Sequence, residues 1–137
     1  MKTVFVDTSA WLALINKTDH RHHKARKVRD DLQEQHSRLV LTDYILLETA
    51  NALSRIPFRK AAVQLISFIR ASEDIQKIEI DKALFQKAWG LYSERLDKEW
   101  SLTDCASFVV MKGMGLTDAF SSDHHFEQAG FNILLKD

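Results

Sequence analysis

Short apolar segments alternate along this chain with longer segments of helical periodicity. The short segments are rich in β-branched and aromatic residues, as buried strands are, and they cover residues 3–6, 39–41, 75–80, 118–121 and 133–135. Helices are expected to start at residues 7–9 and to cover 24–35, 43–55, 59–71, 82–96 and 101 to 113 or 115, with a helical turn from 123. Strands that alternate with helices pair in parallel, because each crossover passes through a helix. The order therefore predicts an α/β fold with a central, mainly parallel sheet.

The composition excludes several other classes of protein. With 137 residues the chain has the length of one ordinary domain, so residues 1–137 are expected to form a single domain. Its 4 glycines and 1 proline are too few for a many-turned sandwich or barrel, and Pro57 is expected to mark the turn before the helix of 59–71. The apolar runs are too short to span a bilayer, and Asp7 interrupts the first of them, so neither a membrane segment nor a leader is expected. A single cysteine, Cys105, excludes an internal disulfide and favours a cytoplasmic location.

The charges balance overall but are unevenly distributed. Nineteen basic residues face nineteen acidic ones, so the chain lacks the net positive charge of a typical DNA-binding protein. Each basic cluster has two interpretations, a solvated helix face or a rim that tracks phosphates, and the sequence leaves open whether the two clusters share one surface. The first cluster consists of Lys17, Arg21, Lys24, Arg26, Lys27 and Arg29, and the second of Arg55, Arg59 and Lys60.

Two acidic residues stand where a carboxylate needs an explanation. Asp7 directly follows the first strand, at the edge of a parallel sheet where ligands bind. It is equally suited to cap the next helix, although Thr8 or Ser9 could do so as well. Glu48 lies on a narrow polar stripe of a helix that is otherwise apolar, so we expect that helix to be largely buried and Glu48 to face a cleft. The alternative for Glu48 is a salt bridge with Arg55 or with a lysine.

Two further acids stand at expected helix starts. Asp104 follows Ser101 at the spacing of a capping box, and Asp123 stands at a strand-to-helix junction, where an N-cap is the structural alternative. The four acids nevertheless call for a joint explanation, because crowded carboxylates repel one another and are costly to bury unpaired. A divalent cation removes this cost. An all-oxygen site favours Mg²⁺ or Mn²⁺, which are ions that assist phosphodiester hydrolysis.

Four segments of the chain, taken in order, resemble the PIN-domain ribonucleases and, within that family, the small VapC-type toxins. The segments are VFVDTSAW at 4–11, LETANAL at 47–53, SLTDCASF at 101–108 and SDHHFEQAGF at 122–131. The resemblance implies a three-layer α/β/α fold with an acidic pocket. Carried over by position, it implies that the catalytic and metal-site carboxylates are Asp7, Glu48, Asp104 and Asp123, with Thr8 in support of the first of them.

Individual roles follow from the same resemblance. Asp7 and Asp104 are expected to bind the metal directly, Glu48 to hold or orient a second ion or its waters, and Asp123 to act directly or through water. Ser121 stands where family members often have threonine, a change that keeps the hydroxyl. Asp118 is a nearby rival for the fourth position but lacks the pattern of residues that follows it.

The resemblance also implies an activity and its partners. The expected protein is a divalent-metal-dependent endoribonuclease that uses Mg²⁺ (or Mn²⁺) to hydrolyse RNA and leaves 5′-phosphate and 3′-hydroxyl ends. As a VapC-type toxin it would form a homodimer and be held by a small antitoxin protein that offers an arginine to the carboxylates. The alternatives are a free-standing PIN ribonuclease without an antitoxin and a catalytically inactive PIN-fold binding module. An aspartyl-phosphate phosphotransferase is disfavoured, because position 9 carries serine where such enzymes have a second acid.

Other residues with reactive or stacking side chains are interpreted as structural. The histidines lack the spacing of a zinc site, and His125 is expected to pack or cap near Asp123. The charge of Asp104 should raise the pKa of the neighbouring Cys105 thiol, which is therefore expected to be a packing residue. The three tryptophans are expected in the core or at an interface rather than against RNA bases; they are Trp11, Trp89 and Trp100.

Overall fold

The sheet of this protein is parallel throughout. The computed structural model describes residues 2–137, in which the strands form one sheet of order β3-β2-β1-β4-β5. Phe5 of the central strand pairs with Val40 on one side and with Ala119 on the other. The α/β fold with a central parallel sheet is thus confirmed. The strands are β1 (Thr3–Val6), β2 (Arg38–Thr42), β3 (Ile75–Ile78), β4 (Asp118–Phe120) and β5 (Asn132–Ile133).

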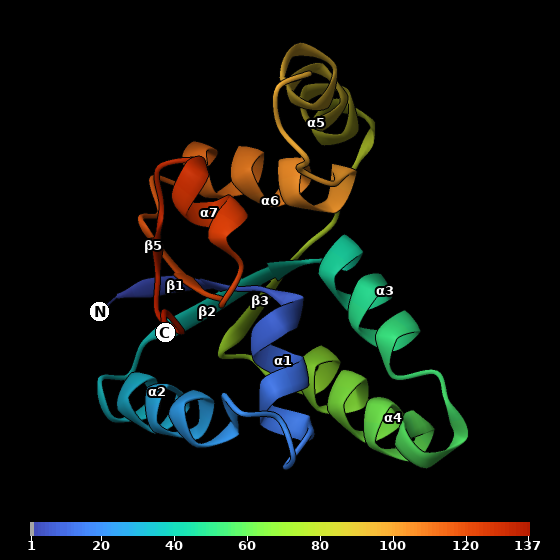
Figure 1. Ribbon diagram of the computed structural model, residues 1–137, viewed down its shortest axis with the longest axis vertical. Coiled ribbons are helices and arrows are strands. Elements are labelled where there is room, and N and C mark those ends of the chain that lie inside the picture. Colours follow the sequence, from blue (N-terminus) through green and yellow to red (C-terminus); the bar gives the residue numbers. More distant parts are fainter. Residues whose placement is uncertain (1) are drawn as a thin grey trace.

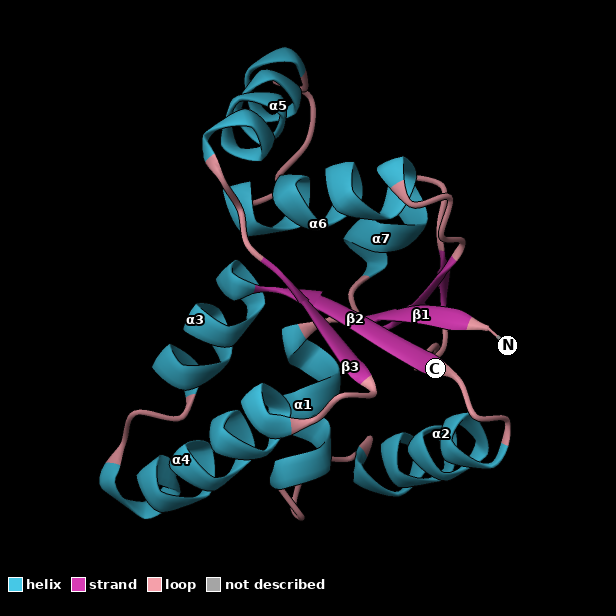
Figure 2. Cartoon of the chain, turned by 180° about the vertical axis from the view of Figure 1, so that it is seen from behind, coloured by secondary structure: helices cyan, strands magenta, loops and turns pink. Residues whose placement is uncertain are grey.

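Helices cover both faces of the sheet and complete the expected three layers (Figure 1). Figure 2, seen from behind, shows the same division, with α5 standing away from the sheet and packed on α6. One layer holds α1 (Thr8–Ile15), α2 (His22–Glu34), α3 (Asp43–Ala52) and α4 (Ile56–Ala71), and the other holds α5 (Lys82–Glu94), α6 (Leu102–Gly113) and α7 (His124–Gln128).

The core fixes the helices that follow β3 against the sheet. Phe126 of α7 is fully buried and meets Phe108 of α6 edge to face, with ring centroids 5.0 Å apart. The opposite side of that cluster is closed by Trp100, whose ring lies 5.1 Å from the ring of Phe108. Aromatic pairs in this geometry add to the stability gained by burial. The packing therefore holds the first turns of α6 and α7 at a fixed place above the sheet.

The strand order reverses between β1 and β4. The chain goes from β1 to β2 and β3 on one side and later returns to fill β4 and β5 on the other. Ligands of open parallel sheets bind where the strand order reverses in this way. Asp7 directly follows β1, and its amide donates to the carbonyl of Phe120, the last residue of β4, at 3.0 Å. The first acid is thus tied to both strands.

Helix α3 is less buried than its sequence predicts. Within it, Ile45 and Thr49 are buried, whereas the side chain of Leu47 is 60% exposed. The helix lies at the rim of its layer and packs against α1 and α4, which leaves its remaining surface open (Figure 1). The expectation of a largely buried helix is therefore wrong.

Helix α4 begins earlier than the sequence predicts. Pro57 lies in its first turn, and the helix starts at Ile56 rather than at residue 59. Proline fits there because the amides of the first turn have no partner within the helix. The strands expected at 75–80 and 133–135 are shorter than predicted, Ile75–Ile78 and Asn132–Ile133.

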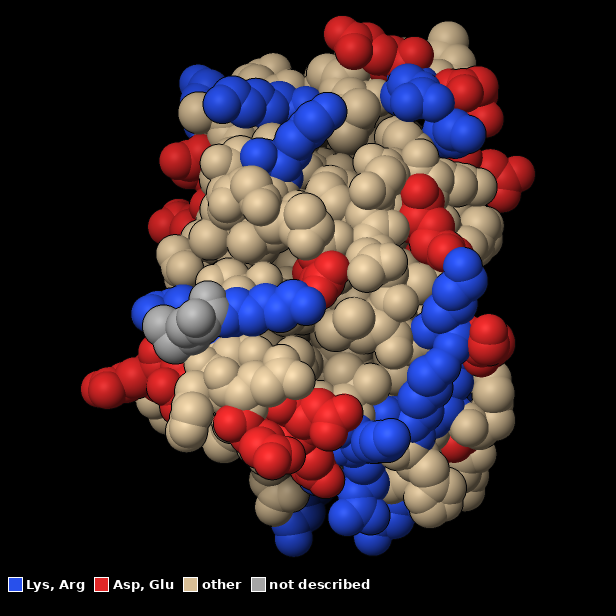
Figure 3. Space-filling view, turned by 90° about the vertical axis from the view of Figure 1, so that its left-hand side faces the viewer, with Lys and Arg blue, Asp and Glu red and all other residues tan. Residues whose placement is uncertain are grey.

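The two basic clusters lie on different sides of α1. The first is carried mainly by α2, on which Lys24, Arg26 and Lys27 are exposed. Figure 3 shows Lys and Arg side chains gathered along the lower part of the face that α2 borders. The second cluster surrounds the start of α4, beyond α1 in Figure 1. Separately, no helix within residues 2–137 has the length and apolar character needed to cross a membrane.

Candidate active site

Asp7 is buried at the end of β1 and is held by hydroxyl groups. Its side chain is in the N-cap position of α1 but makes no capping hydrogen bond. Instead, its Oδ2 accepts hydrogen bonds from the hydroxyls of Ser9 and Ser121, both at 2.8 Å. The structural alternative, a carboxylate that serves the helix start, is therefore not what the side chain does.

The surroundings of Asp7 disfavour its charged form. Burial raises its pKa, the hydrogen bonds from Ser9 and Ser121 lower it, and the charges of Asp104 and Asp123 raise it again, to a value of about 6. Within residues 2–137, no Lys or Arg forms an ion pair with any of these three acids. A buried carboxylate with raised pKa and no Lys or Arg partner is a typical feature of a functional site.

Asp104 caps its helix and still faces the site. The side chain and backbone of Ser101 and Asp104 form the expected capping box, in which the Ser101 amide donates to Asp104 Oδ2 at 3.1 Å. Burial raises the pKa of Asp104, the bond from Ser101 lowers it and the charge of Asp123 raises it, so that it lies above its ordinary value. Capping uses Oδ2, and no hydrogen bond reaches Oδ1 from the described residues. The capping and ligand interpretations are therefore compatible.

Asp123 is placed by the same hydroxyl network that holds Asp7. Its amide donates to the Ser121 hydroxyl at 3.0 Å, and its Oδ1 caps α7 by accepting from the His125 amide at 2.9 Å. The Ser9 hydroxyl in turn accepts from the amide of Ser122 at 3.0 Å. Two serines thus connect the carboxyl ends of β1 and β4 and set the spacing of the two acids that follow those strands.

Glu48 lies on α3, and it is not among the charges that shift the pKa of Asp7 or Asp104. Its side chain is half-buried, and no ion pair with Arg55 or with a lysine forms within residues 2–137, which argues against the salt-bridge alternative. The next residue, Thr49, donates to the hydroxyl of Thr8 at 3.4 Å. Thr8 therefore ties α1 to the helix that carries Glu48, whereas the hydroxyls that reach Asp7 are those of the two serines.

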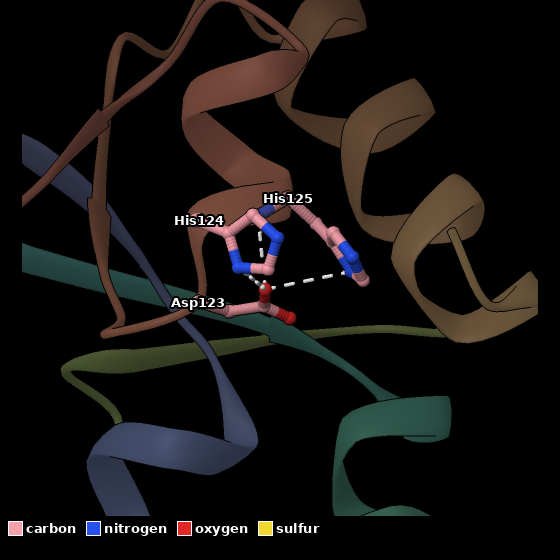
Figure 4. Close-up of side chains that lie close together, drawn as sticks. All are labelled: Asp123, His124 and His125. Atoms are coloured by element: carbon pink, nitrogen blue, oxygen red, sulfur yellow. Dashed lines mark hydrogen bonds and ion pairs between the residues drawn. The ribbon is translucent and has the colours of Figure 1, made fainter. Parts of the chain in front are cut away.

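His125 lies between two of the acids, which the sequence did not indicate. Its Nδ1 is 3.1 Å from Asp104 Oδ2 and 3.4 Å from Asp123 Oδ1. Figure 4 shows its ring and that of His124 turned toward Asp123. The expectation that His125 packs or caps near Asp123 covers its amide but not its ring. Ser9 was considered as a cap of the following helix, whereas its hydroxyl donates to Asp7, two residues before it.

Several residues considered from the sequence lie outside the site. Asp118 is at the amino end of β4, where it pairs with Lys2. Cys105 is fully buried, and burial together with the charge of Asp104 raises its pKa to about 11. Trp11 and Trp100 are buried as expected, whereas Trp89 is 48% exposed.

The comparison with known families agrees with this geometry. Residues 4–132 match the PIN domain. The chain belongs to the PIN-domain family. The match includes all four candidate acids of this PIN domain and both serines that hold Asp7. The resemblance read from the four sequence segments is therefore confirmed.

Within the family, this PIN domain is similar to VapC20 of Mycobacterium tuberculosis. Two curated VapC20 sequences, each named a 23S rRNA-specific endonuclease, are 34% identical over 129 residues, which is 93% of this chain and 95% of theirs. The crystal structure of VapC20, described as a sarcin–ricin loop cleaving toxin, is similar with a TM-score of 0.84 at 32% identity and covers 94% of this chain and 96% of that one.

A more distant structure shares the fold alone. FitAcB from Neisseria gonorrhoeae has a TM-score of 0.65 at 14% identity, with 95% of each chain covered. The fold of this PIN domain is thus retained where little of the sequence is.

Proposed function

We propose that this protein is a divalent-metal-dependent endoribonuclease and the toxin of a VapC-type toxin–antitoxin pair. The observation that carries the proposal is the convergence of Asp7, Asp104 and Asp123 at the carboxyl ends of β1 and β4, with no Lys or Arg paired to them in residues 2–137. The similarity to VapC20 supports RNA as the substrate. Retention of all four acids also argues against an inactive binding module.

The donor set fits a divalent cation. Asp7 and Asp104 each use Oδ2 for their hydrogen bonds, and no hydrogen bond reaches either Oδ1 from the described residues. Carboxylate oxygens are the ligands that Mg²⁺ and Mn²⁺ take in proteins, and a cation would relieve the mutual repulsion of the acids. We infer that Asp7 and Asp104 hold the cation, with Asp123 and Glu48 as further ligands or as acceptors for its waters.

The residues of this chain have distinct tasks in the proposed reaction. When bound, a divalent cation supplies an activated water and neutralises charge that develops on the phosphate oxygens. Ser9 and Ser121 hold the carboxylate of Asp7 in one orientation, and the capping box does the same for Asp104. Glu48, on α3, would orient substrate or solvent. We expect cleavage to leave 5′-phosphate and 3′-hydroxyl ends.

The test is cleavage of labelled RNA by the purified protein. An oligonucleotide with the sarcin–ricin loop is the first substrate to use, because it is what the similar VapC20 cleaves. We expect cutting with Mg²⁺ or Mn²⁺, none with EDTA, and none by Asp104→Asn. The folded state of that variant is checked by circular dichroism. Cleavage by Asp104→Asn, or cleavage in EDTA, would overturn the proposal.

We further propose an antitoxin partner, a homodimer and a cytoplasmic location. The similarity to VapC20, which is described as a toxin, supports the partner. Large apolar side chains exposed on the neighbouring helices α3 and α4, and a stacked aromatic pair on α5, support an interface, since contiguous apolar patches are typical of interaction sites. These side chains include Leu47, Ile56, Val63, Phe68, Trp89 and Tyr92. Sedimentation of the protein alone tests the dimer. Co-purification with the product of an adjacent gene tests the antitoxin.

A further inference from the structure

The ring of His125 occupies the space between two carboxylates of the candidate site. Its Nδ1 lies 3.1 Å from Asp104 and 3.4 Å from Asp123, and its side chain is 20% exposed. The ligand atoms that Asp123, His124 and His125 offer all lie within 4.8 Å of one another, close enough to hold one metal ion (Figure 4). An imidazole nitrogen thus stands at the place where a cation would neutralise the two acids.

The ring is not needed to orient either acid. The backbone amide of Ser101 already donates to Asp104 Oδ2, and the backbone amide of His125 itself donates to Asp123 Oδ1. Both bonds belong to helix caps and persist when the imidazole moves. The hydrogen bond of the ring to Asp104 and its approach to Asp123 duplicate backbone hydrogen bonds, so the ring is available for another task.

Comparison with the neighbouring histidine shows which of the two is placed for that task. His124 Nδ1 lies 3.8 Å from Asp123 Oδ1, its side chain is 71% exposed, and no ion pair joins it to Asp104 in the described residues. His125 approaches the same oxygen more closely, is mostly buried and reaches a second acid. The two residues offer the same chemistry on adjacent positions, and the geometry distinguishes them.

We propose that His125 is a nitrogen ligand of the cation in this site and makes the site selective for Mn²⁺ over Mg²⁺. The proposal rests on the metal-dependent function proposed above and specifies its cofactor. Imidazole suits borderline transition metals, whereas Mg²⁺ prefers oxygen and dehydrates reluctantly. A site with Asp7, Asp104 and Asp123 alone would have little preference between the two ions. The addition of one imidazole shifts it toward Mn²⁺.

The experiment measures Mn²⁺ bound to the wild-type protein and to two matched variants. His125→Asn keeps a hydrogen-bonding side chain near the acids but removes the imidazole, and His124→Asn makes the same change on the exposed neighbour. Pulsed electron paramagnetic resonance reports directly whether an imidazole ¹⁴N is bound to Mn²⁺, without RNA or turnover. Calorimetry gives the Mn²⁺ and Mg²⁺ affinities of all three proteins.

The expected result is a directly bound ¹⁴N in the wild type and in His124→Asn that is lost in His125→Asn. His125→Asn should lower Mn²⁺ affinity by about tenfold or more and Mg²⁺ affinity by less than about threefold. A ¹⁴N signal that persists in His125→Asn overturns the proposal. Mn²⁺ binding without ¹⁴N coupling in the wild type overturns it too but leaves the proposed nuclease intact. Absence of metal binding to the wild type overturns both.

Discussion

Two buried aspartates at opposite ends of β4 have opposite electrostatic surroundings. Asp7, next to its carboxyl end, is 5% exposed, and Asp118, at its amino end, is 6% exposed. Burial raises the pKa of both. At Asp118, hydrogen bonds from Lys2 and Asn132 and the charge of Lys2 outweigh burial, and the pKa lies below its ordinary value. At Asp7 the serine hydroxyls do not outweigh burial and two neighbouring acids, and the pKa rises to about 6.

This difference distinguishes a structural carboxylate, Asp118, from a candidate ligand-binding carboxylate, Asp7. Removing a carboxylate from water is costly unless a countercharge accompanies it. At Asp118 the chain supplies that countercharge through Lys2. At Asp7, residues 2–137 supply neutral donors and two more acids, and no Lys or Arg among them pairs with it. The two side chains thus have similar exposed fractions but different depths and different charged neighbours.

The largest expected effect is on RNA cleavage. Asp7→Asn should reduce cleavage by at least about 100-fold, because the site loses the carboxylate that a cation needs. Asp118→Asn makes the same chemical change at the other end of β4 and should leave cleavage within about threefold of wild type. Initial rates on one labelled RNA under saturating metal compare the two variants. Similar losses in both would remove the distinction drawn between these acids.

The fold was predictable because its signals are local. Apolar segments such as 39–41 and acids that directly follow strands, such as Asp7, can be recognised without knowledge of the partner strand. The predicted helix boundaries and burial were less accurate where contacts with other elements determine them. From the sequence, Pro57 is expected to lie in a turn outside the helix, but proline is tolerated in the first helical turn, where it lies in the structure. Leu47, as an apolar residue of a helix expected to be buried, is predicted to lie in the core, but it lies on the solvent-exposed side of α3.

The acidic residues of the candidate site were predictable from the sequence, but the side chains that contact them from other elements were not. Ser121 donates to Asp7 across 114 positions of sequence, a contact that exists because β4 pairs with β1. The ring of His125 reaches Asp104 across 21 positions because α6 and α7 pack together. Periodicity and spacing describe one element at a time. They therefore locate functional groups at element ends without indicating the groups that meet them from other elements.

The second expected effect is a gain in the stability of the metal-free protein, whereas most substitutions cause a loss. Above pH 6, ionised Asp7 destabilises the metal-free fold, because its folded pKa of about 6 exceeds the unfolded value of 3.8. Asp7→Asn should therefore stabilise the metal-free protein at pH 8 by about 2 kcal/mol, and the gain should shrink toward pH 4.5. Urea unfolding in EDTA at both pH values measures it. A gain that does not depend on pH would contradict this origin.

The third expected effect is on metal binding. A cation binds ionised Asp7, so protons compete with it below the pKa of about 6. The Mn²⁺ affinity of the wild type should be nearly constant from pH 7 to 8 and fall by up to about tenfold per pH unit below 6. Calorimetry in two buffers of different ionisation enthalpy should detect about half a proton released near pH 6 and close to one near pH 5. Flat affinity down to pH 5 would show that Asp7 does not titrate with the metal.

The smallest expected effect concerns the stability contributed by Asp118, at the amino end of β4. Lys2→Met removes the ammonium group from Asp118 but leaves the bonds from Asn132 and Thr117. Because the Lys2 side chain is half exposed and the pair is screened, the loss in unfolding free energy at pH 7 should be about 0.5–1 kcal/mol. Since the partners of Asp118 lower its pKa, its contribution to stability is present at neutral pH and is lost as the pH falls through the acid range. The variant should therefore differ less from wild type at pH 4 than at pH 7 in urea unfolding, while it cleaves RNA at the wild-type rate. A loss of cleavage with intact folding would mean that the two ends of β4 are coupled, and that Asp118 also serves the site.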